Sequence, residues 1–333
     1  MKIFVTGATG FIGKILVLKL AEQDHVIHAL FRSEEKIRSF NHQNIRWFKG
    51  SLNDSDSLVK AMDGCDQVYH IAAFAAIWAK DSSVFYEYNV AGTNNILAAA
   101  VKTGIKKIVY VSTGGIFDPS SGNVIDEKTP YPVKFFGHYE RSKFEAEQLV
   151  IQYVKNGLPV VTVNPTRVYG PGPLLKSNGT VILTDRYIRG KWRIIPGNGT
   201  SIGNYVYVNN VIEGMLQAME SGVPGERYIL SGEDTSFNNL IKIISDISGK
   251  VYRMYRIPLP IMVVTSFFML LYSRFTGNEP LITPDYVRKF SYDWKVSCEK
   301  ARIELGYNPL TLKQGLTKTI EWINRGYKND IYE

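Results

Sequence analysis

Short apolar runs alternate with longer amphipathic segments along the first half of the chain. Apolar runs of four to seven residues predict buried strands, whereas apolar positions that recur every three or four residues predict helices. This alternation predicts an α/β fold, a doubly wound parallel sheet of the Rossmann type with helices on both faces. Strands are expected at 2–6, 25–31, 45–48, 67–71, 107–112 and 159–164, and helices from 11 onward, at 84–102 and at 139–154.

The pattern changes after Pro165, where loops rich in Gly, Pro and Asn precede shorter strands and helices. Such a change indicates a second unit with its own smaller core. We therefore expect a smaller C-terminal α/β lobe that binds substrate, beside the Rossmann domain. The Rossmann domain is expected to span 1–165, with part of 204–225 returning to it, and the substrate lobe to comprise 166–203 and 226–333.

Composition narrows the function classes. Of the 333 residues, 45% are hydrophobic and 21% are charged, which excludes a disordered chain. Two cysteines exclude a disulfide scaffold and a cysteine-built zinc site; no metal site is predicted, and a cytoplasmic location is expected. The net charge of +8 fits a phosphorylated cofactor or an anionic membrane surface. No nucleic-acid motif or basic stripe with interleaved aromatics is present, so nucleic acid is not expected as a partner.

The chain opens with a strand, three glycines spaced by three residues, and a helix. In a dinucleotide site, one glycine makes the tight turn, another lets the backbone approach the pyrophosphate, and the third lets helix and strand pack. The helix N-terminus then offers free N–H groups to the phosphates. Gly7, Gly10 and Gly13 therefore predict a dinucleotide-binding loop.

The end of the second strand bears on the choice between the two nicotinamide cofactors. An acidic residue there would bind the ribose 2′-hydroxyl of NAD, whereas an arginine would bind the 2′-phosphate of NADP. Arg32 stands at this place, with Lys36 one helical turn later. We expect NADP as the cofactor, with NAD as the alternative if Arg32 is only a solvated surface charge.

A tyrosine and a lysine four residues apart share one face of a predicted helix, and a hydroxyl precedes them at a strand end. A tyrosine with its ordinary pKa of about 10 needs a nearby cation to work as an acid–base at neutral pH. A strand-end hydroxyl can bind and polarise a substrate carbonyl. Tyr139, Lys143 and Thr113 therefore predict hydride-transfer chemistry in which the protein moves the proton.

These motifs resemble the extended short-chain dehydrogenase/reductase family, also called the NAD-dependent epimerase/dehydratase family, and within it the bacterial dihydroflavonol-4-reductase-like branch. The resemblance extends over nearly the whole chain. It is carried by TGATGFIG at 6–13, VYHIAA at 68–73, NVAGTNNIL at 89–97, VST at 111–113, YERSK at 139–143, VNPTRVYGPG at 163–172 and KARIELGYNP at 300–309.

The resemblance implies a role for each matching residue. Tyr139 is the acid–base, Lys143 holds the nicotinamide ribose and lowers the tyrosine pKa, and Thr113 binds the substrate oxygen with Ser112 beside it. Relatives of this kind also often form homodimers through the helix that carries the tyrosine. The implied cofactor contacts are Gly7, Thr9, Gly10, Phe11, Ile12, Gly13, Arg32, Lys36, Ser51 (where the family often has Asp), Leu52, Ala72, Ala73, Lys143, Pro165 and Thr166.

Apolar and aromatic side chains stand where substrate is expected, namely Phe74, Trp78, Phe135 and Tyr169. They suit a hydrophobic ketone or secondary alcohol, although aromatics at such positions can equally belong to the core. The predicted function is an NADP(H)-dependent oxidoreductase acting on a dihydroflavonol-, steroid- or 3-keto-acyl-like molecule. The alternative is a nucleotide-sugar epimerase or dehydratase, whose diphosphate would need cations such as the cluster of Arg186, Arg189, Lys191 and Arg193.

An apolar segment at 257–272, IPLPIMVVTSFFMLLY, lies between Arg253 and Arg256 on one side and Arg274 on the other. It is shorter than the roughly 20 residues of a membrane span. We expect a buried helix or a lid of the substrate lobe. The alternative is a peripheral membrane contact, which the flanking arginines favour and which would suit a lipid-like substrate.

Overall fold

The computed structural model describes residues 1–38, 40, 42–120, 122–172 and 178–327. Its large sheet is parallel throughout, in the order β10-β6-β5-β4-β1-β2-β3. Strand order reverses between β1 and β4, which is the switch point of a doubly wound sheet, so the predicted fold class is confirmed. The strands are β1 (Lys2–Thr6), β2 (Val26–Phe31), β3 (Ile45–Lys49), β4 (Gln67–His70), β5 (Lys107–Val111), β6 (Val160–Pro165) and β10 (Arg227–Leu230).

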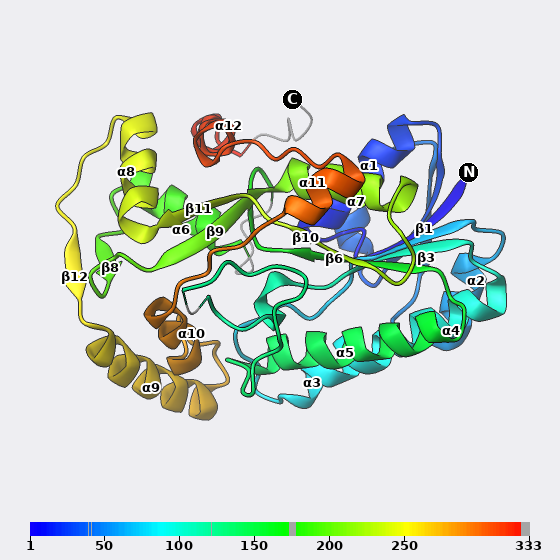
Figure 1. The fold of residues 1–333 in the computed structure, drawn as a ribbon, viewed down its shortest axis with the longest axis horizontal. Coiled ribbons are helices and arrows are strands. Elements are labelled where there is room, and N and C mark those ends of the chain that lie inside the picture. Colours follow the sequence, from blue (N-terminus) through cyan, green and yellow to red (C-terminus); the bar gives the residue numbers. More distant parts are fainter. Residues whose placement is uncertain (39, 41, 121, 173–177, 328–333) are drawn as a thin grey trace.

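Helices cover both faces of this sheet (Figure 1). Side chains along a strand alternate between faces, so Ile3 and Val5 pack with one helix layer and Phe4 packs with the other. One layer contains α1 (Phe11–Glu22), α7 (Val208–Glu220) and α11 (Glu299–Leu305), and the other contains α2 (Ser55–Met62), α4 (Gly92–Thr103) and α5 (His138–Lys155).

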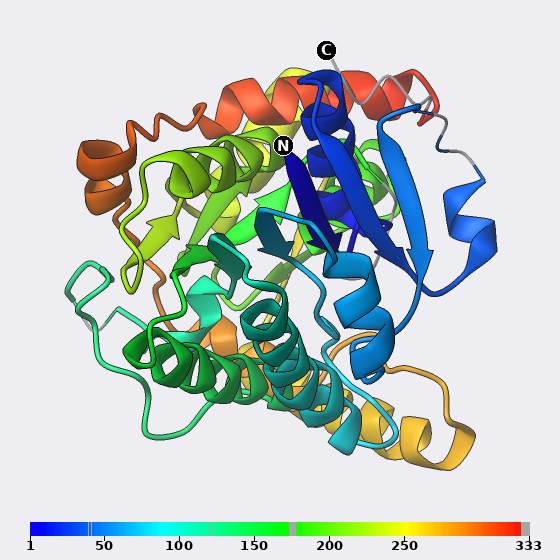
Figure 2. The same cartoon turned by 90° about the vertical axis from the view of Figure 1, so that its right-hand side faces the viewer.

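A smaller lobe packs beside the carboxyl ends of the central strands (Figure 1), and in the turned view of Figure 2 it lies largely behind the large sheet. It holds a three-stranded sheet in the order β11-β9-β7 and a two-stranded sheet of β12 and β8, with a separate aromatic-rich core. Its elements are β7 (Arg167–Tyr169), α6 (Gly179–Ile188), β8 (Ile194–Pro196), β9 (Ile202–Tyr207), β11 (Glu233–Ser236), α8 (Phe237–Ser248), β12 (Tyr255–Ile257), α9 (Leu259–Thr276), α10 (Pro284–Arg288) and α12 (Leu312–Asn324).

Two local features differ from the prediction. The segment Arg227–Leu230 was assigned to the substrate lobe, but as β10 it pairs with β6 in the large sheet, because its side chains are buried on both sheet faces. The helix expected at 84–102 is divided into α3 (Ser83–Tyr86), a π-helical turn η2 (Glu87–Ala91) and α4. Such π-turns inside helices occur frequently at functional sites.

The apolar segment near residue 260 forms α9, and it is not buried. Pro260 lies in the first turn, where its missing N–H costs nothing. Within α9 only Ser266 and Ser273 are buried, so the prediction of a buried helix is wrong. Among the described residues, α9 is the one helix whose length and composition would suffice to cross a membrane.

Candidate active site

The glycine loop is built so tightly that side chains are excluded from it. Gly7 has a φ of +72°, and a Cβ there would lie 2.8 Å from the backbone nitrogen of Ala72. A Cβ on Gly13 would lie 2.1 Å from the Gly7 carbonyl oxygen. Gly10 is the N-cap of α1 and makes no side-chain capping hydrogen bond, which leaves the first N–H groups of the helix for another acceptor.

This geometry fits the pyrophosphate of a dinucleotide. A backbone that approaches this closely, followed at once by an uncapped helix N-terminus, provides N–H donors and positive potential for phosphate oxygens. The predicted contacts Thr9, Phe11 and Ile12 lie in the same turn and first helical residues. Ala72 and Ala73 follow β4 directly beside the loop, and Ala72 N–H donates to Thr6 Oγ1 at 3.2 Å.

The structure brings the predicted catalytic side chains together at the carboxyl end of β5. Thr113 follows β5, and its side chain interacts with that of Tyr139, in the first turn of α5. Lys143 lies one turn later and its Nζ donates to the Val111 carbonyl oxygen at 2.7 Å. Ser112 is buried (4% exposed), so Thr113 is the hydroxyl of the pair that a substrate can reach.

Lys143 is a buried cation, only 1% exposed. Burial lowers its pKa to about 7, and the negative charge of Glu147 acts in the opposite direction. Its Nζ also lies 4.3 Å from the ring centroid of Tyr110, a cation–π contact. Lys143 is therefore held in one position, and its charge responds to pH in the neutral range.

The electrostatics of Tyr139 differ from the expectation. Burial and the adjacent Glu140 raise the pKa of Tyr139 well above its ordinary value, although the hydrogen bond with Thr113 acts the other way. Lys143 is not among the groups that shift this pKa in the structure, where its Nζ donates to the Val111 carbonyl oxygen, so the lowering of the pKa by Lys143 stays a prediction. At neutral pH the phenol keeps its proton, which suits a proton donor.

The nicotinamide end of the predicted site is closed by the loop after β6. Pro165 ends β6, and Thr166 Oγ1 donates to Asn204 Oδ1 at 2.7 Å. A Cβ built on Gly114, next to Thr113, would lie 3.3 Å from the Thr166 side chain. Both predicted residues therefore lie beside the catalytic hydroxyl.

At the adenine end, Arg32 follows β2 and is exposed, with its guanidinium 5.2 Å from the ring centroid of Tyr88. Lys36 is exposed on the following 3₁₀ turn, and Ser51 is half-buried after β3. Leu52 differs from these, because its side chain is buried against Gly92 of α4 and belongs to the core. Only its backbone is left to contact a cofactor.

The predicted substrate residues divide into two groups. Phe74, Trp78 and Phe135 are half-buried; Phe74 packs against Phe85 of α3, and Phe135 against Phe144 of α5. Tyr169 is 1% exposed, and its hydroxyl donates to the Leu312 carbonyl at 3.2 Å. Assigning Tyr169 to substrate was therefore wrong, because its ring and hydroxyl are both used in the core of the smaller lobe.

The π-turn η2 contributes a side chain that sequence reasoning missed. Asn89 is buried, and its Oδ1 accepts from Phe74 N–H at 2.7 Å while its Nδ2 donates to Ser142 Oγ at 2.9 Å. Ser142 Oγ in turn donates to the Tyr139 carbonyl. Asn89 lies in the motif NVAGTNNIL, so the sequence contained a signal for this residue. Only the fold shows that its side chain joins the loop of Phe74 to α5.

A buried histidine links this network to the glycine loop. Burial lowers the pKa of His70 to about 3, so the ring is neutral. Its Nδ1 lies 2.8 Å from Thr6 Oγ1 and its Nε2 lies 3.0 Å from Thr93 Oγ1. Thr93 donates to the Asn89 carbonyl, so it accepts from Nε2–H, and Nδ1 accepts from Thr6.

Two ion pairs tie α5 to the rest of the molecule, and the sequence did not point to either of them. The buried Glu140 pairs with Lys289, which comes directly after α10 of the smaller lobe. Glu147, 1% exposed, pairs with Arg227 of β10 at 3.3 Å. The helix that carries Tyr139 is therefore fixed both to the large sheet and to the lobe expected to bind substrate.

Two of the four cations considered for a sugar diphosphate, Arg189 and Arg193, have partners within the protein. Arg189 donates to Asp185 and to the Tyr327 hydroxyl. The Arg193 guanidinium lies 3.9 Å from the ring centroid of Tyr252. These contacts support the structural interpretation of the cluster over a diphosphate site.

The family model and the relatives that match this chain agree with a nicotinamide-dependent site. A family model described as the NAD dependent epimerase/dehydratase family matches residues 3–231. The chain is 34% identical to a Synechocystis protein named "Putative dihydroflavonol 4-reductase", over 97% of this chain and 95% of that protein. It is 31% identical, over 95% of each chain, to 4-hydroxy-2-methyl-3-oxo-4-farnesyl-3,4-dihydroquinoline-1-oxide ketoreductase of Stigmatella aurantiaca.

Among solved structures, the UDP-glucose 4-epimerase of Thermotoga maritima aligns with a TM-score of 0.81 at 24% identity, covering 98% of this chain and 100% of that one. At this identity the alignment shows a shared fold. The fold is therefore common to enzymes that differ in reaction and substrate.

Proposed function

Because the chain belongs to the NAD-dependent epimerase/dehydratase family, as its motifs predicted, we propose that it is an NADP(H)-dependent oxidoreductase interconverting a ketone and a secondary alcohol on a hydrophobic small molecule. The chain is an NAD(P)-dependent enzyme of the extended short-chain dehydrogenase/reductase type. The observation that carries the proposal is the meeting of the Thr113 and Tyr139 side chains at the end of β5, with the buried Lys143 one turn further along α5, where its Nζ donates to the Val111 carbonyl oxygen.

Tyr139 supplies the proton in this proposal. Its phenol is protonated at neutral pH, because burial and the Glu140 charge disfavour the phenolate. In the reducing direction Tyr139 Oη–H gives its proton to the oxygen of the ketone, and the positive charge of Lys143 stabilises the phenolate that remains. Thr113 also orients the same substrate oxygen, so hydroxyl and phenol converge on one atom.

Lys143 provides the positive charge that the phenolate needs during turnover. With a pKa of about 7, it takes up or releases a proton in the neutral range. A bound nicotinamide cofactor supplies or accepts the hydride. The backbone of the glycine loop, together with Lys143, Pro165 and Thr166, would hold that cofactor, while Asn89 and His70 keep the surrounding backbone in place.

A hydrophobic substrate is favoured by what surrounds the site. Phe74, Trp78 and Phe135 are half-buried near α5, and they present aromatic rather than charged surface. Two of the four cations that a sugar diphosphate would need already have partners in the protein, since Arg189 pairs with Asp185 and Arg193 lies over the Tyr252 ring. The relative from Stigmatella aurantiaca is a ketoreductase of a farnesylated quinoline, which supports ketone reduction on an apolar molecule.

The NADP preference rests on Arg32 at the end of β2. Its side chain is exposed and stacks on Tyr88, which holds the guanidinium near the position of the adenine ribose. An arginine there binds a 2′-phosphate better than a 2′-hydroxyl. The homodimer and the cytoplasmic location stay predictions.

A titration of the purified protein tests the cofactor and the reaction together. Intrinsic fluorescence is followed while NADPH or NADH is added, and NADPH consumption is then measured with a panel of hydrophobic ketones. We expect NADPH to bind at least about tenfold more tightly. Arg32→Gln should remove that preference, whereas Arg46→Gln, an exposed arginine on β3, should not.

The opposite result would support the epimerase alternative. If NAD copurifies with the protein and added NADPH is not consumed with any ketone, the cofactor turns over without leaving. The Arg32 argument would then be wrong, and nucleotide sugars would be the next substrates to test.

A further inference from the structure

Helix α9 shows an inverted distribution of polar and apolar residues. In a surface helix of a soluble protein the apolar stripe faces the core and the polar face meets water. In α9 the buried residues are Ser266 and Ser273, whose hydroxyls donate to the carbonyls of Val263 and Met269 in their own helix. Most of the exposed side chains are apolar. Six of them are more than half exposed, namely Ile261, Val264, Phe267, Phe268, Tyr272 and Phe275.

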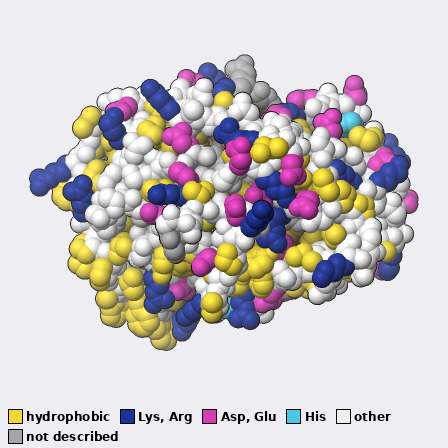
Figure 3. All heavy atoms as spheres, in the orientation of Figure 1, with side chains coloured by type: hydrophobic (Ala, Val, Ile, Leu, Met, Phe, Trp, Pro, Cys, Tyr) yellow, Lys and Arg dark blue, Asp and Glu magenta, His cyan; other side chains and the backbone are white. Residues whose placement is uncertain are grey.

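Exposure of this apolar surface to water costs free energy. Contiguous apolar surface of this kind marks a site that another phase or molecule covers. Figure 3 shows apolar side chains gathered at the corner of the molecule where α9 lies, in the orientation of Figure 1. No charged residue occurs between Leu259 and Ser273, so the helix offers a partner no ion pair along most of its length.

Positive charges flank the apolar stretch at both ends. Arg253 and Arg256 precede α9, and Arg274 occupies its last turn. Apolar residues between arginines suit the boundary of an anionic bilayer, where the rings enter the acyl region and the guanidinium groups meet phosphates. The exposed residues surround α9 on several sides, which a fluid bilayer can cover more completely than a flat protein surface can.

The path of the chain favours a helix that lies in the membrane surface. Eighteen residues span about 27 Å, close to a bilayer core of about 30 Å, so the length of α9 does not decide between a span and a surface helix. Both ends return to the protein, since β12 before the helix pairs with β8, and α10 after it packs back on α9. We propose that α9 docks the enzyme on the surface of a bilayer that contains anionic phospholipid.

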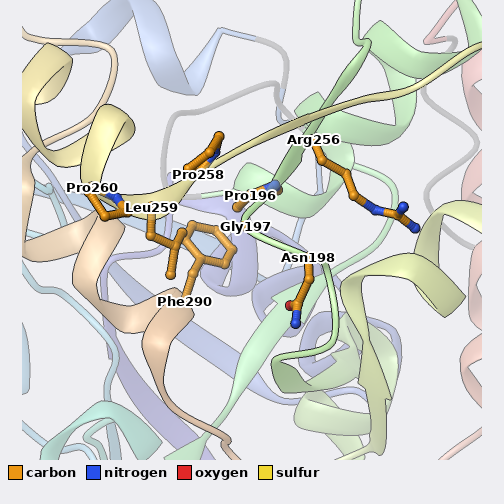
Figure 4. Close-up of a pocket in the computed structure, with 8 residues that line it drawn as sticks. All are labelled: Pro196, Gly197, Asn198, Arg256, Pro258, Leu259, Pro260 and Phe290. Carbon is orange, nitrogen blue, oxygen red and sulfur yellow. The ribbon is translucent and has the colours of Figure 1, made fainter.

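This surface is linked to the catalytic helix. An open cavity of about 510 Å³ lies at the start of α9, with Arg256, Leu259 and Phe290 among its lining residues (Figure 4). The residue before Phe290 is Lys289, which pairs with Glu140 beside Tyr139. A substrate dissolved in the bilayer would therefore reach the lobe that pairs with the helix of Tyr139 through Lys289. This consequence rests on the proposed function, whereas docking itself does not.

Vesicle flotation of the full chain, without substrate, tests the docking. We expect the protein to float with phosphatidylcholine–phosphatidylglycerol vesicles, and less with phosphatidylcholine alone. Phe268→Asp/Phe275→Asp should reduce the bound fraction at least about tenfold. Ile303→Asp is the matched control, because Ile303 is also apolar and 74% exposed but lies on α11. Cofactor binding by each variant shows that its fold is intact.

Two outcomes would overturn the proposal. The wild-type protein could fail to float, or the double variant could float as well as the wild type. If, instead of floating, the wild type forms a concentration-dependent dimer in sedimentation experiments and the double variant is monomeric, α9 is a self-association surface. Since no reaction is measured, failure of the proposed ketone reduction would leave this test unaffected.

Discussion

Two helices of equal length, α5 and α9, show opposite relations between sequence pattern and burial. Both contain 18 residues. Helix α5 buries the ionisable side chains of Glu140, Lys143 and Glu147, whereas α9 exposes aromatic and aliphatic side chains and buries two serines. Each arrangement costs free energy in isolation, because charges favour water and apolar groups avoid it.

The two costs are offset in different ways. In α5 the compensation lies within the protein: Lys143 donates to Val111, lies over Tyr110 and is near Glu147, which itself pairs with Arg227. In α9 nothing in the described part of the chain covers the apolar face, so the compensation comes from outside. Residues that break the local pattern are therefore the basis of both proposals, catalysis in α5 and docking in α9.

The largest effect is expected where α5 carries the chemistry. Tyr139→Phe removes the proton donor while keeping the ring, so kcat should fall by about 10²- to 10⁴-fold with cofactor binding unchanged. Steady-state NADPH oxidation with an active ketone measures this. Tyr153→Phe is the control on the same helix, since its hydroxyl donates to Asn94 away from the site.

A Tyr139→Phe variant that keeps most of its turnover would mean that another group moves the proton. The buried polar face of α5 would then be structural, and its contrast with α9 would no longer separate chemistry from docking.

The sequence predicted the fold well, because the strands of a parallel sheet are buried on both faces and read as continuous apolar runs. It also predicted the glycine loop and the Tyr139–Lys143 pair, whose spacing is local. It could not predict partners that meet only through the fold. Asn89 on the π-turn, Glu140 with Lys289, and Glu147 with Arg227 are joined across large sequence separations.

The wrong predictions have a common physical reason. Apolar and aromatic residues look alike in sequence whether they contact core, substrate or lipid. Tyr169 was assigned to substrate and is buried in the core, whereas α9 was expected to be buried and is exposed. The periodicity of α9 did not reveal which of its faces is buried, because apolar residues occur on nearly all its sides.

A second, smaller effect concerns the buried charge of α5. The pKa of Lys143 is about 7 in the folded protein and 10.5 as its ordinary value. Between these values the unfolded chain holds a proton that the folded protein has released, so this group makes stability rise with pH. The free energy of unfolding should rise by up to about 1.4 kcal/mol per pH unit, or by about 2–3 kcal/mol from pH 7 to 9.

Urea unfolding of the wild type and Lys143→Met at pH 7, 8 and 9 measures this contribution. Between pH 7 and 9 the free energy of unfolding of the variant should rise by that much less than the free energy of the wild type. If both rise equally with pH, Lys143 is not a buried titrating group. The range stops at pH 9 because burial raises the pKa of the Cys65 thiol to about 12. Above pH 9 that thiol ionises in the unfolded chain and lowers stability.

The smallest effect is expected on the exposed face of α9, and it is informative because the same substitution can be made in both helices. Val150 of α5 is 1% exposed, and Val264 of α9 is 55% exposed. Val150→Ala should lower the free energy of unfolding by about 2 kcal/mol, since it removes buried methyl groups and leaves a cavity. Val264→Ala should change it by less than about 0.5 kcal/mol, because no packing is lost and alanine favours the helix.

Urea unfolding of both variants without lipid makes the comparison. If Val264→Ala costs as much as Val150→Ala, the apolar face of α9 is already covered in solution by a second copy of the chain, and a bilayer is not needed to explain it.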